Sequence, residues 1–348
     1  MLRITAAANA HARGIIGLDT ASLGSRSLLA SCAYDGAVKL WELESGQLHL
    51  LHTLTGSSTG PVFSVALNAL RDALMLCSGS HCRRLSMWRC SLSDEIVGAP
   101  ALQWRSAQHT GWVRAIAVNE VGDAMPKELY SIGCNRVLCW SLQAAPDGDG
   151  RSCDGEIAIF EDAQQVRSHD VLCLGHGDGN LAAGSVDGAL RVWATAGVAA
   201  ADMPQTRAAH WIGHNGQRVA DVAWLRDGHL ISAGYDGRVR SWRRVDGTSN
   251  RCPGAPAPWA LAGEVRAATS AGGRALALAS GRGDRVLCGT SDGAISLFRG
   301  PGLAPVDTLR LDGRRATAAA SVLTRGGDGE SLFVVGDSDG DLHVVCDQ

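Results

Sequence analysis

The chain has 348 residues, of which 45% are hydrophobic, and a formal net charge of −3. This composition is sufficient for a packed core, and no apolar run approaches the roughly 18 residues that a membrane helix needs, which argues against membrane insertion. The 32 Lys and Arg residues are scattered and form no basic stripe of the kind that nucleic-acid-binding proteins show.

The eleven cysteines are irregularly spaced, and most stand inside apolar stretches. Disulfide frameworks are typical of short secreted chains, and zinc sites need paired Cys or His ligands at short spacing. The N-terminus also lacks the charged-then-apolar layout of a signal peptide. We therefore expect buried free thiols, no metal or other cofactor, and an intracellular location in the cytoplasm, the nucleus or both.

The predicted elements, taken in chain order, are repeated pairs of strands. Residues 31–41 read Ser-Cys-Ala-Tyr-Asp-Gly-Ala-Val-Lys-Leu-Trp, in which Asp35-Gly36 separates two apolar runs. Asp-Gly in this setting predicts a hairpin turn, because Gly adopts positive φ without steric cost. The same pattern returns at residues 183–193, 232–242, 288–298 and 335–345.

Two weaker copies fill the gaps between these five. Residues 78–88 carry Cys82-Arg83 at the turn, and residues 131–140 are one residue shorter, with Cys134-Asn135. The last residues of consecutive copies lie 47 to 56 residues apart. An earlier apolar strand precedes each copy, and a further strand follows every copy except the last, which ends three residues before Gln348. The sequence therefore predicts seven units of up to four strands each.

These units resemble the WD-repeat family, whose repeat of about 40–45 residues begins near Gly-His and ends at Trp-Asp. Gly213-His214 with Trp242 matches best, whereas the Asp after the Trp is absent from every copy. The resemblance spans residues 1–348 and implies a single all-β domain, a seven-bladed β-propeller with four antiparallel strands per blade. It also implies that residues 2–8 complete the seventh blade and close the ring, which hides an edge strand.

Ser232, His214 and Asp236 are residue types of a nucleophilic triad. The resemblance instead implies a buried hydrogen-bond chain that runs from Trp242 through these residues and ties the strands together. The same set recurs in the first copy, which is not expected of a catalytic site, so we expect a protein that is not an enzyme. The sixth copy has Glu264 in place of the His. The two predicted tetrads are His11, Ser31, Asp35 and Trp41, and His214, Ser232, Asp236 and Trp242.

The resemblance further implies that partners bind the face that carries the turn of each copy, around a central channel. Residues before each turn Asp, or beside the first apolar residue of the innermost strand, are expected there. Aromatic residues and Arg are enriched at binding hot spots. The candidate partner-binding residues are Tyr34, Phe63, His81, Trp112, Arg114, Arg218, Tyr235, Glu264 and Arg266.

The predicted function is that of a non-catalytic scaffold or adaptor, a monomeric ring within a larger complex that binds one or more proteins or peptides and no nucleic acid. Three alternatives stay open. One is an enzyme that uses a polar cluster in the channel. Another is a phosphoinositide-binding propeller, because Phe298-Arg299-Gly300 resembles the Phe-Arg-Arg-Gly motif but carries one Arg. The third is a substrate-recruiting subunit of a ubiquitin ligase or other complex, although no copy reads Trp-Asp-x-Arg.

Overall fold

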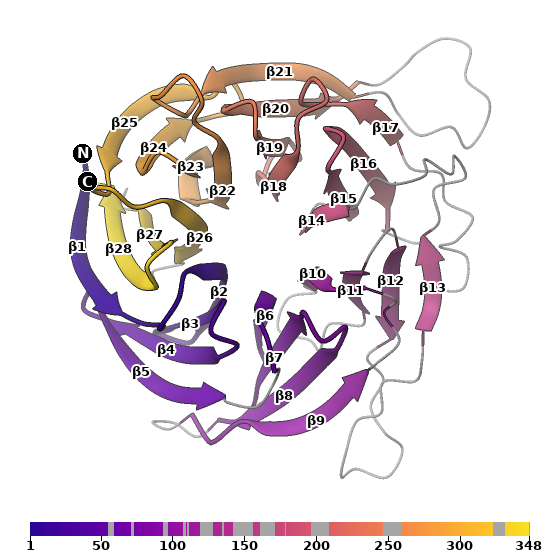
Figure 1. Ribbon diagram of the computed structural model, residues 1–348, viewed down its shortest axis with the longest axis vertical. Helices are drawn as coiled ribbons and strands as arrows, with labels where there is room; N and C mark the ends of the chain where they lie inside the picture. Colours follow the sequence, from indigo (N-terminus) through magenta and orange to yellow (C-terminus); the bar gives the residue numbers. More distant parts are fainter. Residues whose placement is uncertain are drawn as a thin grey trace.

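The computed structural model describes residues 1–54, 59–70, 73–92, 97–106, 109, 111–118, 128–133, 136–141, 156–160, 171–177, 179–195, 209–245, 259–322 and 331–347. In these residues the strands form seven four-stranded antiparallel sheets, which stand as blades around a central axis (Figure 1). The fold class is therefore the predicted one, an all-β seven-bladed propeller. No helix in the described part of the chain is long and apolar enough to cross a membrane.

Six blades take four consecutive strands, from the innermost to the outermost. The strands of blades one to three are β2 (Ile15–Leu23), β3 (Arg26–Ala33), β4 (Val38–Glu44) and β5 (Gln47–Leu54); β6 (Val62–Ala69), β7 (Ala73–Ser80), β8 (Leu85–Ser91) and β9 (Ala101–Ser106); and β10 (Val113–Val118), β11 (Glu128–Gly133), β12 (Arg136–Ser141) and β13 (Glu156–Phe160). The strands of blades four to six are β14 (Val171–Gly177), β15 (Asn180–Ser185), β16 (Ala189–Ala194) and β17 (Ala209–Ile212); β18 (Val219–Trp224), β19 (Leu230–Gly234), β20 (Arg238–Arg244) and β21 (Trp259–Arg266); and β22 (Ala275–Ser280), β23 (Arg285–Thr290), β24 (Ala294–Arg299) and β25 (Ala304–Arg310).

Blade seven joins the two ends of the chain. Its inner strands are β26 (Ala316–Val322), β27 (Ser331–Asp337) and β28 (Asp341–Asp347), and its outermost strand is β1 (Leu2–Asn9). β1 pairs antiparallel with β28 from Leu2 to Asn9. The predicted closure of the ring by the N-terminal segment is confirmed, and Figure 1 shows both termini at this blade.

The turn between the second and third strands follows the sequence pattern. The Gly of each predicted Asp-Gly pair has a positive φ, for example 81° at Gly36 and 76° at Gly237. In blade two Arg83 takes this position with φ of 62°, a conformation that costs a non-Gly residue energy. Cys134 and Asn135 lie outside the described residues.

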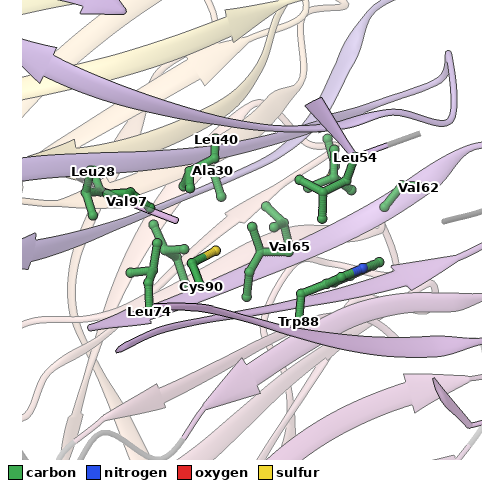
Figure 2. Packing of buried hydrophobic residues seen from close by; sticks show 14 residues of the cluster. Leu28, Ala30, Leu40, Leu54, Val62, Val65, Leu74, Trp88, Cys90 and Val97 are labelled. Atoms are coloured by element: carbon green, nitrogen blue, oxygen red, sulfur yellow. The ribbon is translucent and has the colours of Figure 1, made fainter. Parts of the chain in front are cut away.

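Apolar side chains pack between neighbouring blades. Between blades one and two, Leu28 and Leu40 face Val65, Leu74 and Trp88 from the next sheet (Figure 2). These residues are at most 6% exposed, and full burial of a Leu or Val contributes about 2 kcal/mol. Adjacent blades therefore share cores, and this packing holds the sheets in the ring.

Hydrogen bonds between the innermost strands reinforce this packing. Asp19 on β2 accepts a bond of 2.7 Å from the backbone of Leu67 on β6, and Asp221 on β18 accepts one of 2.8 Å from Leu278 on β22. At the closing seam, Thr317 on β26 donates to the carbonyl of Ile15 at 2.7 Å. Buried polar groups in the channel wall thus find partners on the neighbouring blade.

The two tetrads form buried hydrogen-bond chains inside blades one and five. In blade five, Trp242 Nε1 donates to Ser232 Oγ at 2.9 Å, and Ser232 Oγ lies 2.8 Å from His214 Nε2. His214 Nδ1 lies 3.0 Å from Asp236. Burial raises the pKa of Asp236, but bonds from His214 and Arg240 outweigh it and hold that pKa well below its ordinary range.

Blade one repeats this geometry. Trp41 Nε1 donates to Ser31 at 2.9 Å, and His11 lies 2.8 Å from Ser31 and 3.0 Å from Asp35. Burial lowers the pKa of His11 and keeps the ring neutral at neutral pH. The neutral ring lets one nitrogen accept and the other donate, as the chain of bonds requires.

Blade three carries a shortened chain. Trp140 Nε1 donates to Ser131 at 2.7 Å, which lies 2.8 Å from His109 Nε2. The other nitrogen of His109 has no hydrogen-bond partner among the described residues. Burial lowers the pKa of His109 to about 4.

In blade six, Glu264 does not occupy the position that His11 and His214 occupy in blades one and five. The backbone N–H groups of Gly213 and His214 both donate to Gly188, the turn Gly of blade four. Ala267 and Ala268 make the same pair of bonds to the turn Gly of blade five. Ala268 therefore stands where the His was expected, and the prediction for Glu264 was wrong.

Blade seven has a different buried polar group. Asp337 is fully buried and accepts bonds from the N–H groups of Asp339, Gly340 and Asp341. His343 lies 2.9 Å from its carboxylate and Arg314 lies 3.0 Å away. This network replaces the tetrad in the closing blade.

Deletion of residues 1–8 removes nearly all of β1 and exposes the edge of β28. We expect the melting temperature to fall by about 10 °C or more, because the lost pairing and packing amount to several kcal/mol, and the soluble yield to drop. A synthetic peptide of residues 1–9 should restore part of the loss. An unchanged melting curve would contradict this role of β1.

Replacement of Ser232 with Ala leaves Trp242 Nε1 and His214 Nε2 without their shared partner. The unfolding free energy should fall by about 2 kcal/mol, the cost of unsatisfied buried polar groups, as measured by urea denaturation. Ser25→Ala, at an exposed hairpin tip, is the matched control and should change stability by less than about 0.5 kcal/mol. Equal decreases in unfolding free energy for Ser232→Ala and Ser25→Ala would show that the tetrad does not stabilise the blade.

The folded state is also expected to lose stability in mild acid through His109. The unfolded chain binds a proton at His109 below pH about 6.5, whereas the folded chain binds it only near pH 4. The unfolded state thus holds more protons in this range, so the unfolding free energy falls by about 2 kcal/mol from pH 7 to pH 5. In His109→Gln this contribution is absent, and urea titrations at both pH values should show a smaller decrease. The same decrease in both proteins would refute the assignment.

Candidate functional site

A channel of about 650 Å³ runs through the ring and is lined by the innermost strands of all seven blades. Because the strands of a blade are antiparallel, each innermost strand begins at the end of the blade where the turn between the second and third strands lies. We call this end of the ring the turn face. Side chains that open the innermost strands and those of the turns therefore meet at one mouth of the channel.

A repeated backbone hydrogen bond fixes that mouth. In five blades, the residue directly before the Asp-Gly pair of the turn, or before its counterpart Cys82-Arg83, donates its N–H to the carbonyl of the residue directly before the innermost strand. We call the latter residue the mouth position. The pairs are Tyr34 with Gly14 at 3.1 Å, His81 with Pro61 at 2.9 Å, Tyr235 with Arg218 at 2.8 Å, Ser291 with Arg274 at 2.9 Å, and Ser338 with Arg315 at 3.0 Å.

A β-bulge opens every innermost strand. In all seven blades the pairing of the two inner strands shifts register around the second residue of the innermost strand. A bulge frees a residue from the ladder and re-aims its side chain. The residues at this bulge all line the channel: Ile16, Phe63, Arg114, Leu172, Ala220, Leu276 and Thr317.

Blades two and three bring Phe63, His81, Trp112 and Arg114 into one group, which we call the tryptophan cluster. The centroid of Trp112 lies 5.7 Å from that of Phe63 and 4.8 Å from that of His81. The guanidinium of Arg114 lies 5.0 Å from the centroid of Trp112 and 5.7 Å from that of Phe63. Trp112 is nevertheless 42% exposed, so one face of the cluster is open to a partner.

Blades five and six form a second group, the tyrosine cluster, of Arg218, Tyr235 and Arg274. Two guanidiniums flank one ring, Arg274 at 4.7 Å and Arg218 at 5.7 Å from the centroid of Tyr235. β18 and β22 lie across the channel from β6 and β10 (Figure 1). The two clusters therefore stand on opposite sides of the mouth.

Among the described residues, four arginines lie at the mouth. Arg114, Arg218, Arg274 and Arg315 line the channel, and none of them has an ion pair with another described residue. Deeper in the wall, desolvation raises the pKa of Asp221 to about 7, which weakens its negative charge.

Carboxylates near the turns are engaged within their own blades. Asp35 accepts from His11 and two backbone N–H groups, and Asp236 pairs with His214 and Arg240. Asp292 accepts bonds from Thr269 and Ser270. These acids hold their own loops, and none of the three forms an ion pair with the four mouth arginines.

Seven of the nine predicted face residues lie around the channel mouth, in the two clusters or, as with Tyr34, at a turn beside the channel; Tyr34 is 51% exposed. Glu264 and Arg266 do not lie beside an innermost strand. They belong to β21, the outermost strand of blade five, where Glu264 pairs with Arg238 and Arg240. Their placement was wrong because the innermost strand of blade six begins at Ala275, ten residues after Val265.

Sequence reasoning missed Arg274 and Arg315, which occupy the mouth position of blades six and seven. A spacing signal was present for one of them. Arg274 stands 18 residues before Asp292, as Arg218 stands 18 residues before Asp236. Arg315 has no such regular spacing, because the first two strands of blade seven are joined by a longer connection.

Comparison with known proteins agrees with this architecture. The WD40 family profile (WD domain, G-beta repeat) matches residues 5–42, 160–194 and 205–243, and no curated protein sequence gives a match. Among solved structures, the chain is similar to the crystal structure of the WD40 beta propeller domain of Doa1, with a TM-score of 0.67 and 15% identity over 100% of this chain and 97% of that one. That likeness shows the fold alone. The three segments that the profile matches are therefore WD40 repeats, and they lie in a ring of seven four-stranded blades.

Proposed function

We propose that this protein is a non-catalytic scaffold or adaptor that binds a partner protein at the turn face. WD40 propellers are typically protein-interaction scaffolds, and the tryptophan cluster is the observation that carries the proposal here. Trp112 keeps 42% of its surface exposed although Phe63, His81 and Arg114 surround it. An exposed indole ring is unfavourable in a free protein, because apolar surface contacts water, and it is favourable in a complex, where a partner covers it.

The cluster is also ordered in advance. Stacking against Phe63 and His81 limits the orientations of the Trp112 ring, and Arg114 is held over both aromatic faces. Side chains that are already fixed lose less entropy when a partner binds. The surface therefore has the composition and the rigidity of a binding hot spot.

The two Ser-His-Asp sets support a non-catalytic role. Ser31, Ser232 and His214 have no exposed surface, so a substrate has no path to either hydroxyl. Each hydroxyl also accepts from a Trp indole. Their contacts suit fastening of the blades, and the proposal assigns function to the turn face instead.

The proposal places the protein inside the cell. The cysteines in the described residues are free, and all of them except Cys82 are buried. Burial raises the pKa of the Cys90 thiol to about 11 and of Cys139 to about 12, which suppresses the reactive thiolate. Unpaired thiols of this kind suit a reducing compartment.

The combined change of Trp112 and Arg114 to Ala tests the proposed face. Tagged wild-type and variant proteins are purified from the native cell, and bound proteins are quantified by mass spectrometry. At least one partner should fall about tenfold or more, because hot-spot truncations cost about 2 kcal/mol or more. The melting temperature should change by less than about 3 °C, since surface changes cost little.

Val306→Ala is the matched control, because Val306 is 44% exposed near the start of β25, toward the end of blade six that is opposite the turn face. It should retain every partner. Loss of partners together with a large fall in melting temperature would instead mean that Trp112 serves packing of blades two and three. Retention of all partners by the Trp112 and Arg114 variant would overturn the proposed face.

A further inference from the structure

The arginines of the mouth differ from Arg240 and Arg314, which also lie near turns. Arg240 pairs with Asp236 and Glu264, and Arg314 pairs with Asp337 and Asp341. Arg218, Arg274 and Arg315 occupy one structural position in three consecutive blades and are exposed. In a chain with 35 acidic and 32 basic residues, such a run of uncompensated guanidiniums is a local excess of positive charge.

Three of the four guanidiniums at the mouth lie against aromatic rings. Tyr235 contacts Arg218 and Arg274 through its ring, and Phe63 and Trp112 contact Arg114 in the same way. Contact with an aromatic ring uses the flat side of a guanidinium, whereas its N–H groups point along the edges. Those edges match the geometry of a carboxylate, which accepts two parallel bonds.

We propose that the mouth binds an acidic peptide segment of the partner, with Asp or Glu side chains placed on both sides of the channel. This inference rests on the proposed function and names the chemistry of its partner. One end of the segment meets Arg218, Arg274 and Arg315, and the other end meets Arg114. Trp112, Tyr34 and Tyr235 supply apolar surface for the residues between the acidic ones.

Charge distribution favours a peptide over a nucleic acid. A nucleic acid presents a phosphate at every step and binds to an extended basic stripe. Here the four arginines that line the channel are grouped at its mouth, and the turns around it carry Asp35, Asp236 and Asp292. A short segment with an acidic side chain at each end fits this pattern. A continuous polyanion would extend beyond the mouth and be repelled by the surrounding carboxylates.

Selection from a random peptide display library against the full chain tests the proposal. Selected peptides should be enriched in Asp and Glu, and the same selection on a variant with Arg274→Gln and Arg315→Gln should lose that enrichment. A fluorescently labelled selected peptide then serves as the probe in anisotropy titrations. Its Kd should rise about tenfold for each Arg→Gln change, because a hydrogen bond to a charged group contributes on that scale.

Two controls complete the experiment. Arg299→Gln changes an exposed Arg at the far end of β24 and should leave the Kd unchanged. The Asn and Gln analogue of the selected peptide should bind at least tenfold more weakly, and added salt should weaken the acidic peptide only. Melting curves of the Gln variants should match the wild type, since the replaced arginines are exposed.

Four outcomes overturn the inference: enrichment of neutral or basic peptides, no enrichment, equal binding of the amide analogue, or tighter binding of a single-stranded oligonucleotide than of the acidic peptide. The proposed function fails separately, because its variant changes Trp112 and Arg114 on one side of the mouth, whereas the charge test changes Arg274 and Arg315 on the other side. If a native partner is lost from the variant at Trp112 and Arg114 but is retained by the variant at Arg274 and Arg315, the proposed scaffold function is supported and the proposal of an acidic segment is refuted.

Discussion

The close approach of the second strand of each blade to the innermost strand of the next blade is the constraint on which the rest of the structure depends. A Cβ added at Gly79 would lie 2.5 Å from a methyl of Val113 in the next blade, and one at Gly336 would lie 2.6 Å from Ile15. Such distances exclude any larger residue, so each blade is a wedge that is thinnest at the axis. The wedge shape brings neighbouring strands close enough for bonds such as that from Leu278 to Asp221. The pairing of β1 with β28 completes blade seven and closes the ring.

This frame determines what the channel mouth presents. The backbone at the mouth position is held by the turn above it, and the bulge directs the following side chain into the channel. A residue at either place therefore occupies a fixed point in the ring whatever its chemistry. Leu172 and Ala220 leave one side of the wall apolar, whereas Phe63 and Arg114 belong to the tryptophan cluster at the same structural position. Preorganised sites of this type bind with a smaller loss of entropy.

The sequence predicted the fold because its strongest signals are local. The Asp-Gly turns and the apolar runs on either side recur in five copies, and the closing strand follows from strand order. The face residues were harder, because their identification needs the start of each innermost strand. In blade six the run around Val265 has the alternation of a strand, yet it belongs to the outer edge of blade five. Only pairing in three dimensions separates β21 from β22, so Arg274 was missed and Glu264 was misplaced.

The distribution of carboxylates explains how a chain of net charge −3 can present a positive mouth. An Asp at a turn accepts bonds from nearby backbone N–H groups and stabilises its hairpin, so the repeat uses acidic residues inside each blade. Asp35, Asp236 and Asp292 all serve this purpose, and bonds from their neighbours keep them ionised. The mouth position has no such local use for an acid or a base. An Arg there contributes little to the blade that carries it, and its charge faces the channel, where it is open to a ligand from outside the ring.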